Sequence, residues 1–507
     1  MNIADVLQTA FMSLYTFVLV MVSVYGLHRY VIVYLFLRHR HKAPAPAGQF
    51  TELPRVTVQL PMYNEEAVAR RIIEETARID YPREKLQIQV LDDSTDGTCR
   101  IAQDTVDRLK AQGVDIQYLH RDDRTGYKAG ALDAAMPHVT GEFITIFDAD
   151  FIPRADVLQR SIQYFSDPDV CVVQTRWEHL NREDSWLTKA QGIFLDGHFA
   201  IEHVARNRSE RFMSFNGTAG TWRKTAIAAA GGWHHDTLTE DLDLSYRAQL
   251  KGWKFVFLPE VTAPAELPPE MNAFKAQQFR WTKGGAQVAL KLLPKIMLSK
   301  APLKVKIESF FHLTGFCLHI YMFALVIMLF PAIFLRTVVV QDGSIWRTVV
   351  DMGVFVLATM SAFVFYLASQ LQLSRDWRTV FKFMPMLMAL GVGICISNSK
   401  AIIEALAGKQ SEFVRTPKYG QGGRAAASST TKRKSRKLLP YIEFAFGIYM
   451  TVCAVFSVIY IQAALTAPFL LIFAFGFFYV SILSFQAERA TRPAKGLVAP
   501  VEETASR

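Results

Sequence analysis

Long stretches without charge limit what this chain can fold into. No Asp, Glu, Lys or Arg stands between Glu443 and Glu488, within Phe310–Leu335 or within Gly353–Leu371. A helix needs about 20 apolar residues to cross the hydrocarbon core of a bilayer, so each shorter stretch predicts one span and the longest predicts a hairpin of two. Residues 301–488 are therefore predicted to be a membrane region.

The first residues carry another apolar stretch. Phe11–Phe36 is apolar except for His28 and Arg29, and a basic run follows it at once. A cleavable signal peptide would carry its charge before a shorter apolar core, so residues 1–42 predict a transmembrane anchor. The positive-inside rule then places the N-terminus outside and the next residues in the cytoplasm, with the Ala- and Pro-rich residues 43–54 as a linker.

Residues 55–300 have the pattern of an α/β domain. Short apolar or β-branched runs alternate with helical stretches such as Glu65–Ile79 and Thr98–Gln112. The runs predicted to be strands are Val56–Leu60, Leu86–Leu91, Asp115–Leu119, Glu142–Phe147, Val170–Thr175 and Trp253–Leu258. This alternation predicts a mostly parallel sheet covered by helices, in which ligands bind beyond the carboxyl ends of the strands.

One apolar segment has two interpretations. Phe383–Ser399 contains Pro385 and has basic residues on both sides, so the positive-inside rule puts both of its ends in the cytoplasm. We expect a re-entrant or interfacial segment, and a true span is the alternative. The basic run 432–437 predicts another cytoplasmic loop, for which lipid headgroup binding and a purely topological role are both open. Residues 489–507 are expected to form a cytoplasmic tail.

Paired acids follow two of the predicted strands. Asp148 and Asp150 are one residue apart, so their carboxylates project to the same side, and Mg²⁺ or Mn²⁺ prefers such oxygens together with those of a diphosphate. A solvated turn is the alternative for this triplet alone. Asp92 and Asp93 precede Gly97 and fit the edge of a nucleotide site, where a capped strand-to-helix turn is the alternative.

A third acidic pair begins a predicted helix. Thr239 is expected to cap this helix, and Glu240 and Asp241 follow it. Acids at a helix N-terminus are also ordinary complements of the helix dipole. Displacement of a nucleotide from a sugar requires a base that takes the proton of the incoming hydroxyl, and Asp241 beside Glu240 is our candidate for it.

A last motif lies directly before the membrane region. Gln277, Arg280 and Trp281 recur at i, i+3 and i+4, which puts them on one helix face. Arg280 can contact a diphosphate, and Trp281 offers a flat surface to a sugar ring. The alternative, an amphipathic helix with Trp at the membrane interface, explains Trp281 but not Gln277.

Together these motifs resemble the membrane-embedded, processive family 2 glycosyltransferases of the cellulose synthase superfamily. Four motifs occur in the order of that family, as Asp92-Asp93, Asp148-x-Asp150, Thr239-Glu-Asp241 and Gln277-x-x-Arg280-Trp281. Residues 413–418, Phe-Val-Arg-Thr-Pro-Lys, resemble its gating loop, with Arg415 where that family has Val. This loop is closer to the plant cellulose synthase-like A and C groups, and the resemblance covers about residues 55–485.

The resemblance implies a GT-A type domain and an inverting, metal-dependent transfer. The donor would be UDP-glucose or GDP-mannose, and the acceptor the 4-hydroxyl of a growing β-1,4-linked polysaccharide that passes through the membrane helices. Further donor contacts are implied for Tyr63 and Glu65 on the base side, Lys128 at the diphosphate, and Phe413, Thr416 and Lys418 in the gating loop 409–420.

The motifs are also compatible with two other functions. A lipid glucosyltransferase of the ceramide glucosyltransferase type shares the acidic motifs and the Arg-Trp pair but adds one sugar to a lipid. A transporter or scaffold that only binds nucleotide would leave Asp241 and residues 277–281 without a purpose.

Composition bears on the partners. The net charge of +10 suits a protein that lies against anionic lipid and handles an anionic nucleotide, and its basic residues gather around apolar runs, which disfavours nucleic acid. The five cysteines have no paired spacing, so neither a disulfide framework nor a zinc site is indicated. We expect a multi-pass protein of the plasma (inner) membrane with a cytoplasmic catalytic domain; a second copy of the chain or an export partner outside the membrane stays open.

Overall fold

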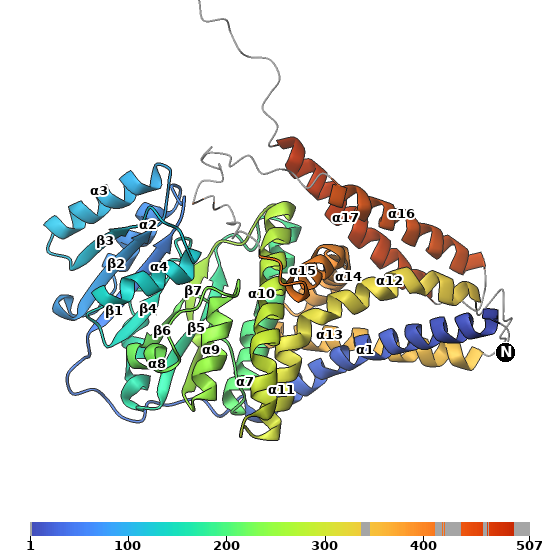
Figure 1. The fold of residues 1–507 in the computed structure, drawn as a ribbon, viewed down its shortest axis with the longest axis horizontal. Helices are drawn as coiled ribbons and strands as arrows, with labels where there is room; N and C mark the ends of the chain where they lie inside the picture. Colours follow the sequence, from blue (N-terminus) through green and yellow to red (C-terminus); the bar gives the residue numbers. More distant parts are fainter. Residues whose placement is uncertain are drawn as a thin grey trace, which may run out of the picture.

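The computed structural model has a sheet domain and a bundle of long helices (Figure 1). It describes residues 3–335, 345–410, 418, 420, 438–459, 464 and 466–490. The helices α1, α12, α13, α16 and α17 run away from the sheet domain, and the N-terminus lies at their far end (Figure 1). This is the predicted arrangement of an α/β domain between two sets of apolar helices.

The sheet is mostly parallel, as predicted. Its strands are β1 (Val56–Met62), β2 (Leu86–Asp92), β3 (Ile116–His120), β4 (Phe143–Ile146), β5 (Val170–His179), β6 (Gly220–Arg223) and β7 (Lys254–Ala265). They are ordered β3-β2-β1-β4-β6-β5-β7, and only β6 runs antiparallel to its neighbours. Strand β6 was not predicted because its four residues, Gly-Thr-Trp-Arg, carry no alternating apolar pattern.

The paired strands β5 and β7 are longer than the sequence predicts. Beyond an irregularity between Thr175 and Arg176, they continue in register from Arg176 and Thr262 to His179 and Ala265. A bulge of this kind adds twist and redirects a strand. The extension carries the sheet toward the long helices.

Helices cover the sheet on both faces, as an α/β domain requires. They are α2 (Ala69–Ala77), α3 (Thr98–Ala111), α4 (Tyr127–Ala135), α5 (Val157–Ser161), α6 (Trp186–Asp196), α7 (Val204–Arg208), α8 (Lys224–Ala229) and α9 (Glu240–Leu250), with a π-helix at Gly197–His203 after α6. The prediction of α3 is confirmed to within one residue. Helix α2 begins four residues later than predicted because a turn that includes Asn64, at φ 53°, comes first.

Long helices form the rest of the described chain. They are α1 (Ile3–His39), α10 (Met271–Leu298), α11 (Leu303–Thr314), α12 (Leu318–Phe334), α13 (Ile345–Gln372), α14 (Arg378–Gly393), α15 (Cys395–Leu406), α16 (Leu438–Ile459) and α17 (Ala467–Ala490). Among the described residues, five helical segments are long and apolar enough to cross a membrane. The predicted hairpin is present as α16 and α17, which lie side by side (Figure 1).

The predicted span Phe310–Leu335 is not one straight helix. A 3₁₀ turn at Gly315–Cys317 separates α11 from α12, and the two helices take different directions in Figure 1. The segment with two interpretations, Phe383–Ser399, falls in α14 and α15, which are drawn nearly end-on beside α10 while the long helices lie across the view (Figure 1). This orientation agrees with an interfacial segment. Arg378–Leu406 is, however, one of the five segments long and apolar enough to cross a membrane, so both interpretations stay predictions.

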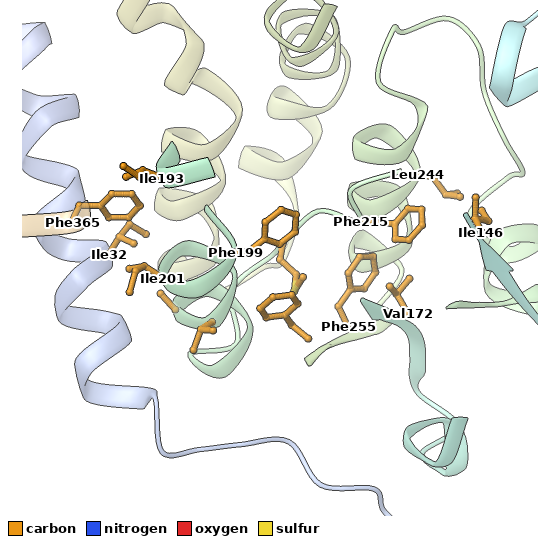
Figure 2. Close-up of a cluster of buried hydrophobic side chains, with 14 of the residues drawn as sticks. Ile32, Ile146, Val172, Ile193, Phe199, Ile201, Phe215, Leu244, Phe255 and Phe365 are labelled. Carbon is orange, nitrogen blue, oxygen red and sulfur yellow. The ribbon is translucent and has the colours of Figure 1, made fainter. Parts of the chain in front are cut away.

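One apolar core joins the sheet domain to the long helices. Figure 2 shows Ile146 of β4 and Val172 of β5 at one end of a cluster of buried side chains and Phe365 of α13 at the other, with Phe199 between them. Burial of a large apolar side chain contributes about 1.5–3 kcal/mol. The position of the sheet relative to the helices is therefore fixed by packing.

Close packing of α14 on α17 gives a test of the bundle. A Cβ added at Gly393 would lie 2.5 Å from Cγ2 of Val480 and 2.6 Å from the carbonyl oxygen of Gly476, whereas one at Gly391 would meet nothing within 4 Å. We expect Gly393→Ala to lower the unfolding temperature of the purified protein in detergent, through an overpacking cost of about 1–3 kcal/mol. Gly391→Ala, on the same helix, is the control and should leave it unchanged. Equal effects would mean that α14 and α17 do not pack as described.

Candidate functional site

A pocket of about 220 Å³ opens at the carboxyl ends of β1 and β4. It is lined by acids and bases that several elements supply, and we call it the acidic pocket. Among its lining residues are Tyr63, Glu65, Asp93, Arg124, Lys128, Asp148, Asp150, Glu240, Asp241, Glu266, Gln277, Arg280, Trp281 and Lys418. The structure thus brings together most of the residues that the sequence marked from distant positions.

Two lysines meet the two carboxylates that follow β4. Lys128 donates hydrogen bonds to Asp148 and, at 2.9 Å, to the carbonyl oxygen of Gly217. Lys418 Nζ donates to Asp150 Oδ2 at 2.6 Å. The pKa of each lysine is raised, because the attraction of the carboxylates outweighs the opposing effect of burial. Both ammonium groups are thus held charged in a pocket whose acids also suit a hard divalent cation.

Asp241 lies at the start of α9 and is half-buried. Burial, and secondly the charge of Glu240, raises its pKa to about 7. Burial also raises the pKa of Glu240, against the lowering effect of Lys128. A carboxyl with a pKa near neutrality can exchange a proton under physiological conditions, which is what general-base chemistry requires.

The prediction that Thr239 caps α9 through its side chain is wrong. Thr239 occupies the N-cap position, but its hydroxyl makes no cap hydrogen bond. The amide of Leu242 instead donates to Oδ1 of Asp241 at 2.8 Å. This bond orients the Asp241 carboxylate, whose other oxygen would lie 3.1 Å from a Cβ placed on Gly217.

Asp92 and Asp93 have different environments. Asp92 is fully buried, and its carboxylate accepts hydrogen bonds from the Ser94 amide at 2.9 Å and the Tyr118 hydroxyl at 2.7 Å. It does not line the pocket, so its predicted substrate contact is replaced by the alternative, a capped turn after β2. Asp93 does line the pocket, and Arg121 holds both of its oxygens at 2.8 and 2.6 Å.

The sequence did not mark Arg124. Its guanidinium lies 3.4 Å from the centre of the Tyr63 ring, and both residues line the acidic pocket. Such cation–π stacking requires a specific approach of two loops. The one available signal was its place four residues before Lys128, in the loop that precedes α4.

A second, larger cavity of about 580 Å³ runs among the long helices. Its lining combines residues of the sheet domain with residues of α1, α12, α13, α14 and α17. It shares seven lining residues with the acidic pocket, namely Trp177, Leu195, Asn216, Thr239, Asp241, Gln277 and Trp281. We call it the helix-bundle cavity, and it meets the acidic pocket at Asp241 and Trp281.

Helix α10 forms the wall where the two hollows meet. Gln277 and Trp281 line both of them, and Arg280 lines the acidic pocket alone. Trp281 keeps 37% of its surface exposed, so its ring remains available for contact. Phe413 and Thr416 lie outside the described residues, and of the three residues predicted in the gating loop only Lys418 is placed in the pocket.

Comparison with known proteins gives one family. Residues 54–284 match the model of the glycosyltransferase like family 2. The chain is 32% identical to glucomannan 4-beta-mannosyltransferase 7 of Arabidopsis thaliana over 421 residues, which cover 80% of this chain and 72% of that protein. It is 40% identical to glucomannan 4-beta-mannosyltransferase 1 of Oryza sativa subsp. japonica over 288 residues, 55% of each chain. The chain thus spans about half the length of some curated relatives that it matches.

A solved structure shares the fold. The mannosyltransferase PcManGT from Pyrobaculum calidifontis, in complex with GDP-Man and Mn²⁺, matches with a TM-score of 0.54 and 22% identity, covering 78% of this chain and 100% of that one. At this identity the match speaks for the fold alone. It agrees with the mostly parallel sheet described above.

The ionised Asp241 carboxylate should weaken the fold, because its pKa is raised to about 7. An acid whose folded pKa is raised to about 7 costs stability that grows with pH from its unfolded value up to the folded one. We therefore expect Asp241→Asn to raise the unfolding temperature, and to do so more at about pH 8 than at about pH 5, without added nucleotide sugar. Asp104→Asn, on the exposed face of α3, is the control. A variant less stable than the wild type at both pH values would mean that the carboxylate supports the fold.

Proposed function

The chain belongs to the cellulose synthase-like family 2 glycosyltransferases, and from this premise we propose that it transfers mannose from GDP-mannose to the 4-hydroxyl of a growing β-1,4-linked polysaccharide. One observation carries the proposal. The acidic pocket, which suits a nucleotide diphosphate, meets a larger cavity at the half-buried carboxylate of Asp241 and the exposed ring of Trp281. UDP-glucose is the alternative donor.

The charges of the acidic pocket suit a nucleotide sugar. Its base would lie on the side of Tyr63 and Arg124, near Glu65 and Asp93, and its diphosphate near Lys128 and Arg280. Asp148 and Asp150 offer the hard oxygen ligands that Mg²⁺ or Mn²⁺ prefers. Both carboxylates already pair with a lysine, so this part of the pocket stabilises positive charge. Such an ion would neutralise the charge that develops on the departing diphosphate.

Asp241 is placed to act as the base. It lines both hollows, so a hydroxyl that enters from the helix-bundle cavity can reach it. Asp241 would take the proton of the 4-hydroxyl while that oxygen bonds to the anomeric carbon and the bond to the nucleotide breaks, which inverts the configuration. Trp281 would hold the terminal sugar by stacking, and Gln277 would hydrogen-bond it.

The helix-bundle cavity would then carry the polymer. It continues from Asp241 past residues of α10 to those of α12, α14 and α17. A chain that grows by one sugar at Asp241 would advance along this cavity and leave through the membrane. Lys418 of the predicted gating loop already donates to Asp150, and from there it would contact the diphosphate of the donor.

Product analysis tests the proposal. Purified protein would be incubated with labelled GDP-mannose or UDP-glucose and with Mg²⁺ or Mn²⁺, and the insoluble product examined by linkage analysis. We expect β-1,4-linked mannose from GDP-mannose. A labelled product that extracts into organic solvent would favour the single-transfer lipid glucosyltransferase instead, and donor binding without any transfer would favour the nucleotide-binding scaffold.

The metal assignment predicts a loss of activity without a loss of fold. Asp148→Asn and Asp150→Asn should each reduce metal-dependent transfer by roughly 10²-fold or more, because the diphosphate loses its charge partner. Each variant also removes the carboxylate partner of Lys128 or Lys418, so its unfolding temperature should fall, and transfer is compared at a temperature at which both variants are folded. Asp156→Asn, which alters a surface pair with Arg154, is the matched control. Near-normal transfer by either variant in the presence of a chelator would refute the assignment.

The base assignment predicts a separation of binding from turnover. Asp241→Asn should bind the donor normally but lose roughly 10²-fold or more in kcat, because the base is needed only when the hydroxyl attacks. The ionised form is the active one, so kcat/KM of the wild type should fall as the pH drops through about 7, the value to which the pKa is raised. Glu240→Gln should move this limb to lower pH by removing the neighbouring charge. Equal losses of binding and turnover in Asp241→Asn would make Asp241 a structural acid.

A further inference from the structure

A groove lies between α1 and α11 on the outside of the bundle. It encloses about 570 Å³. Two contacts join the helices at or beside the groove: the Tyr25 hydroxyl donates to Thr314 Oγ1 at 2.8 Å, and His28 and Phe311, which line the groove, stack at 4.1 Å. The other lining residues come from α1, α11 and Arg211.

Most of the groove wall is apolar and exposed. Leu27 and Val31 of α1 are 37% and 49% exposed, and Leu303 and Ile307 of α11 are 71% and 50% exposed. Helices α1 and α11 both belong to segments apolar enough to cross a membrane. Such a surface beside a spanning helix contacts lipid chains rather than water.

Cations gather at the end of the groove nearest the sheet domain. Arg211 and Lys304 line the groove itself. Arg38, Lys42, Arg211 and Lys304 are all close enough to His39 for their charges to act on it. We call Arg38, Lys42, Arg211 and Lys304 the basic cluster.

The acids nearby leave the cluster positively charged. Glu210 pairs with Lys304 at 2.8 Å but is 85% exposed, so it can turn away into water. Glu308 lines the groove, yet its carboxylate is held by Arg206 at 3.0 Å and His28 at 3.1 Å. The groove therefore offers an apolar wall and an excess of positive charge at one end.

We propose that this groove binds one anionic phospholipid of the cytoplasmic leaflet, with its phosphate on the basic cluster and an acyl chain between α1 and α11. The charge pattern excludes a zwitterionic lipid as the preferred ligand, because each Lys or Arg near an anionic headgroup adds favourable energy that a neutral headgroup does not gain. The apolar wall excludes free phosphate, which would gain nothing from Leu27, Val31 and Ile307. This site is independent of the sugar that the enzyme transfers.

The groove also adjoins a series of hydrogen-bonded polar side chains that reaches the helix-bundle cavity. Glu308 accepts from Arg206, and Arg206 donates to Glu202 at 3.3 Å. His198 lies 3.0 Å from both Glu202 and Asn216, and His198 and Asn216 line the helix-bundle cavity. A lipid in the groove would thus lie beside Glu308, which these hydrogen bonds connect to residues that line the helix-bundle cavity.

Native mass spectrometry of the full chain tests the site. Protein purified from nanodiscs that contain phosphatidylcholine and phosphatidylglycerol should retain one phosphatidylglycerol in preference to phosphatidylcholine. The double variant Arg211→Gln and Lys304→Gln should bind it about 30-fold more weakly, the factor expected for two cations near an anionic headgroup. Arg100→Gln with Lys110→Gln, on α3 far from the membrane helices, removes the same charge and should bind as the wild type does.

Further experiments distinguish binding of a phospholipid from binding of free phosphate, and they keep the test valid if the double variant misfolds. Val31→Trp, which fills the groove and keeps the cations, should also lose the lipid, whereas added inorganic phosphate should not displace it from the wild type. A phosphatidylglycerol with a photoreactive acyl chain should label α1 and α11 of the wild type. Equal retention of both lipids, displacement by phosphate, or labelling confined to other helices would overturn the proposal.

Discussion

Two buried ion pairs fix helix α10, and the arrangement of the site depends on them. Lys275 pairs with Glu443 of α16 at 2.6 Å, and Lys283 pairs with Glu404 of α15 at 3.1 Å. Loss of one partner of such a pair leaves a buried charge and typically costs about 3–5 kcal/mol. Gln277, Arg280 and Trp281 lie between the two lysines on this helix, so the pairs hold the wall between the acidic pocket and the helix-bundle cavity.

This arrangement places a highly charged pocket directly beside a cavity among apolar helices. The acidic pocket concentrates carboxylates, lysines and arginines at the carboxyl ends of the strands, where the proposed nucleotide would bind. The helix-bundle cavity begins within the same residues and continues among apolar helices. Ion pairs with lysines stabilise the carboxylates of Asp148 and Asp150 in the pocket. Asp241 has no direct ion pair among the described contacts, and its pKa is raised.

The sequence predicted those parts that local rules control. Alternating runs identified the strands, and acids placed directly after them, such as Asp93, Asp148 and Asp150, had to meet at one edge of a parallel sheet. Where only tertiary packing decides, prediction failed. The short strand β6 has no alternating apolar pattern. The Asp92 carboxylate is buried and accepts hydrogen bonds from Ser94 and Tyr118, and the Thr239 hydroxyl makes no cap hydrogen bond. Arg124 and the helix-bundle cavity depend on contacts between distant loops and helices, which no spacing encodes.

The central claim is that a sugar hydroxyl from the helix-bundle cavity meets the donor at Asp241. The most direct test is a cryo-EM structure of the protein in a nanodisc with a β-1,4-mannan oligosaccharide and a non-transferable GDP-mannose analogue. The account predicts the oligosaccharide inside the cavity, its terminal ring on Trp281 and its 4-hydroxyl within hydrogen-bonding distance of the Asp241 carboxylate. An oligosaccharide bound elsewhere, or a terminal ring turned away from Asp241, would contradict it.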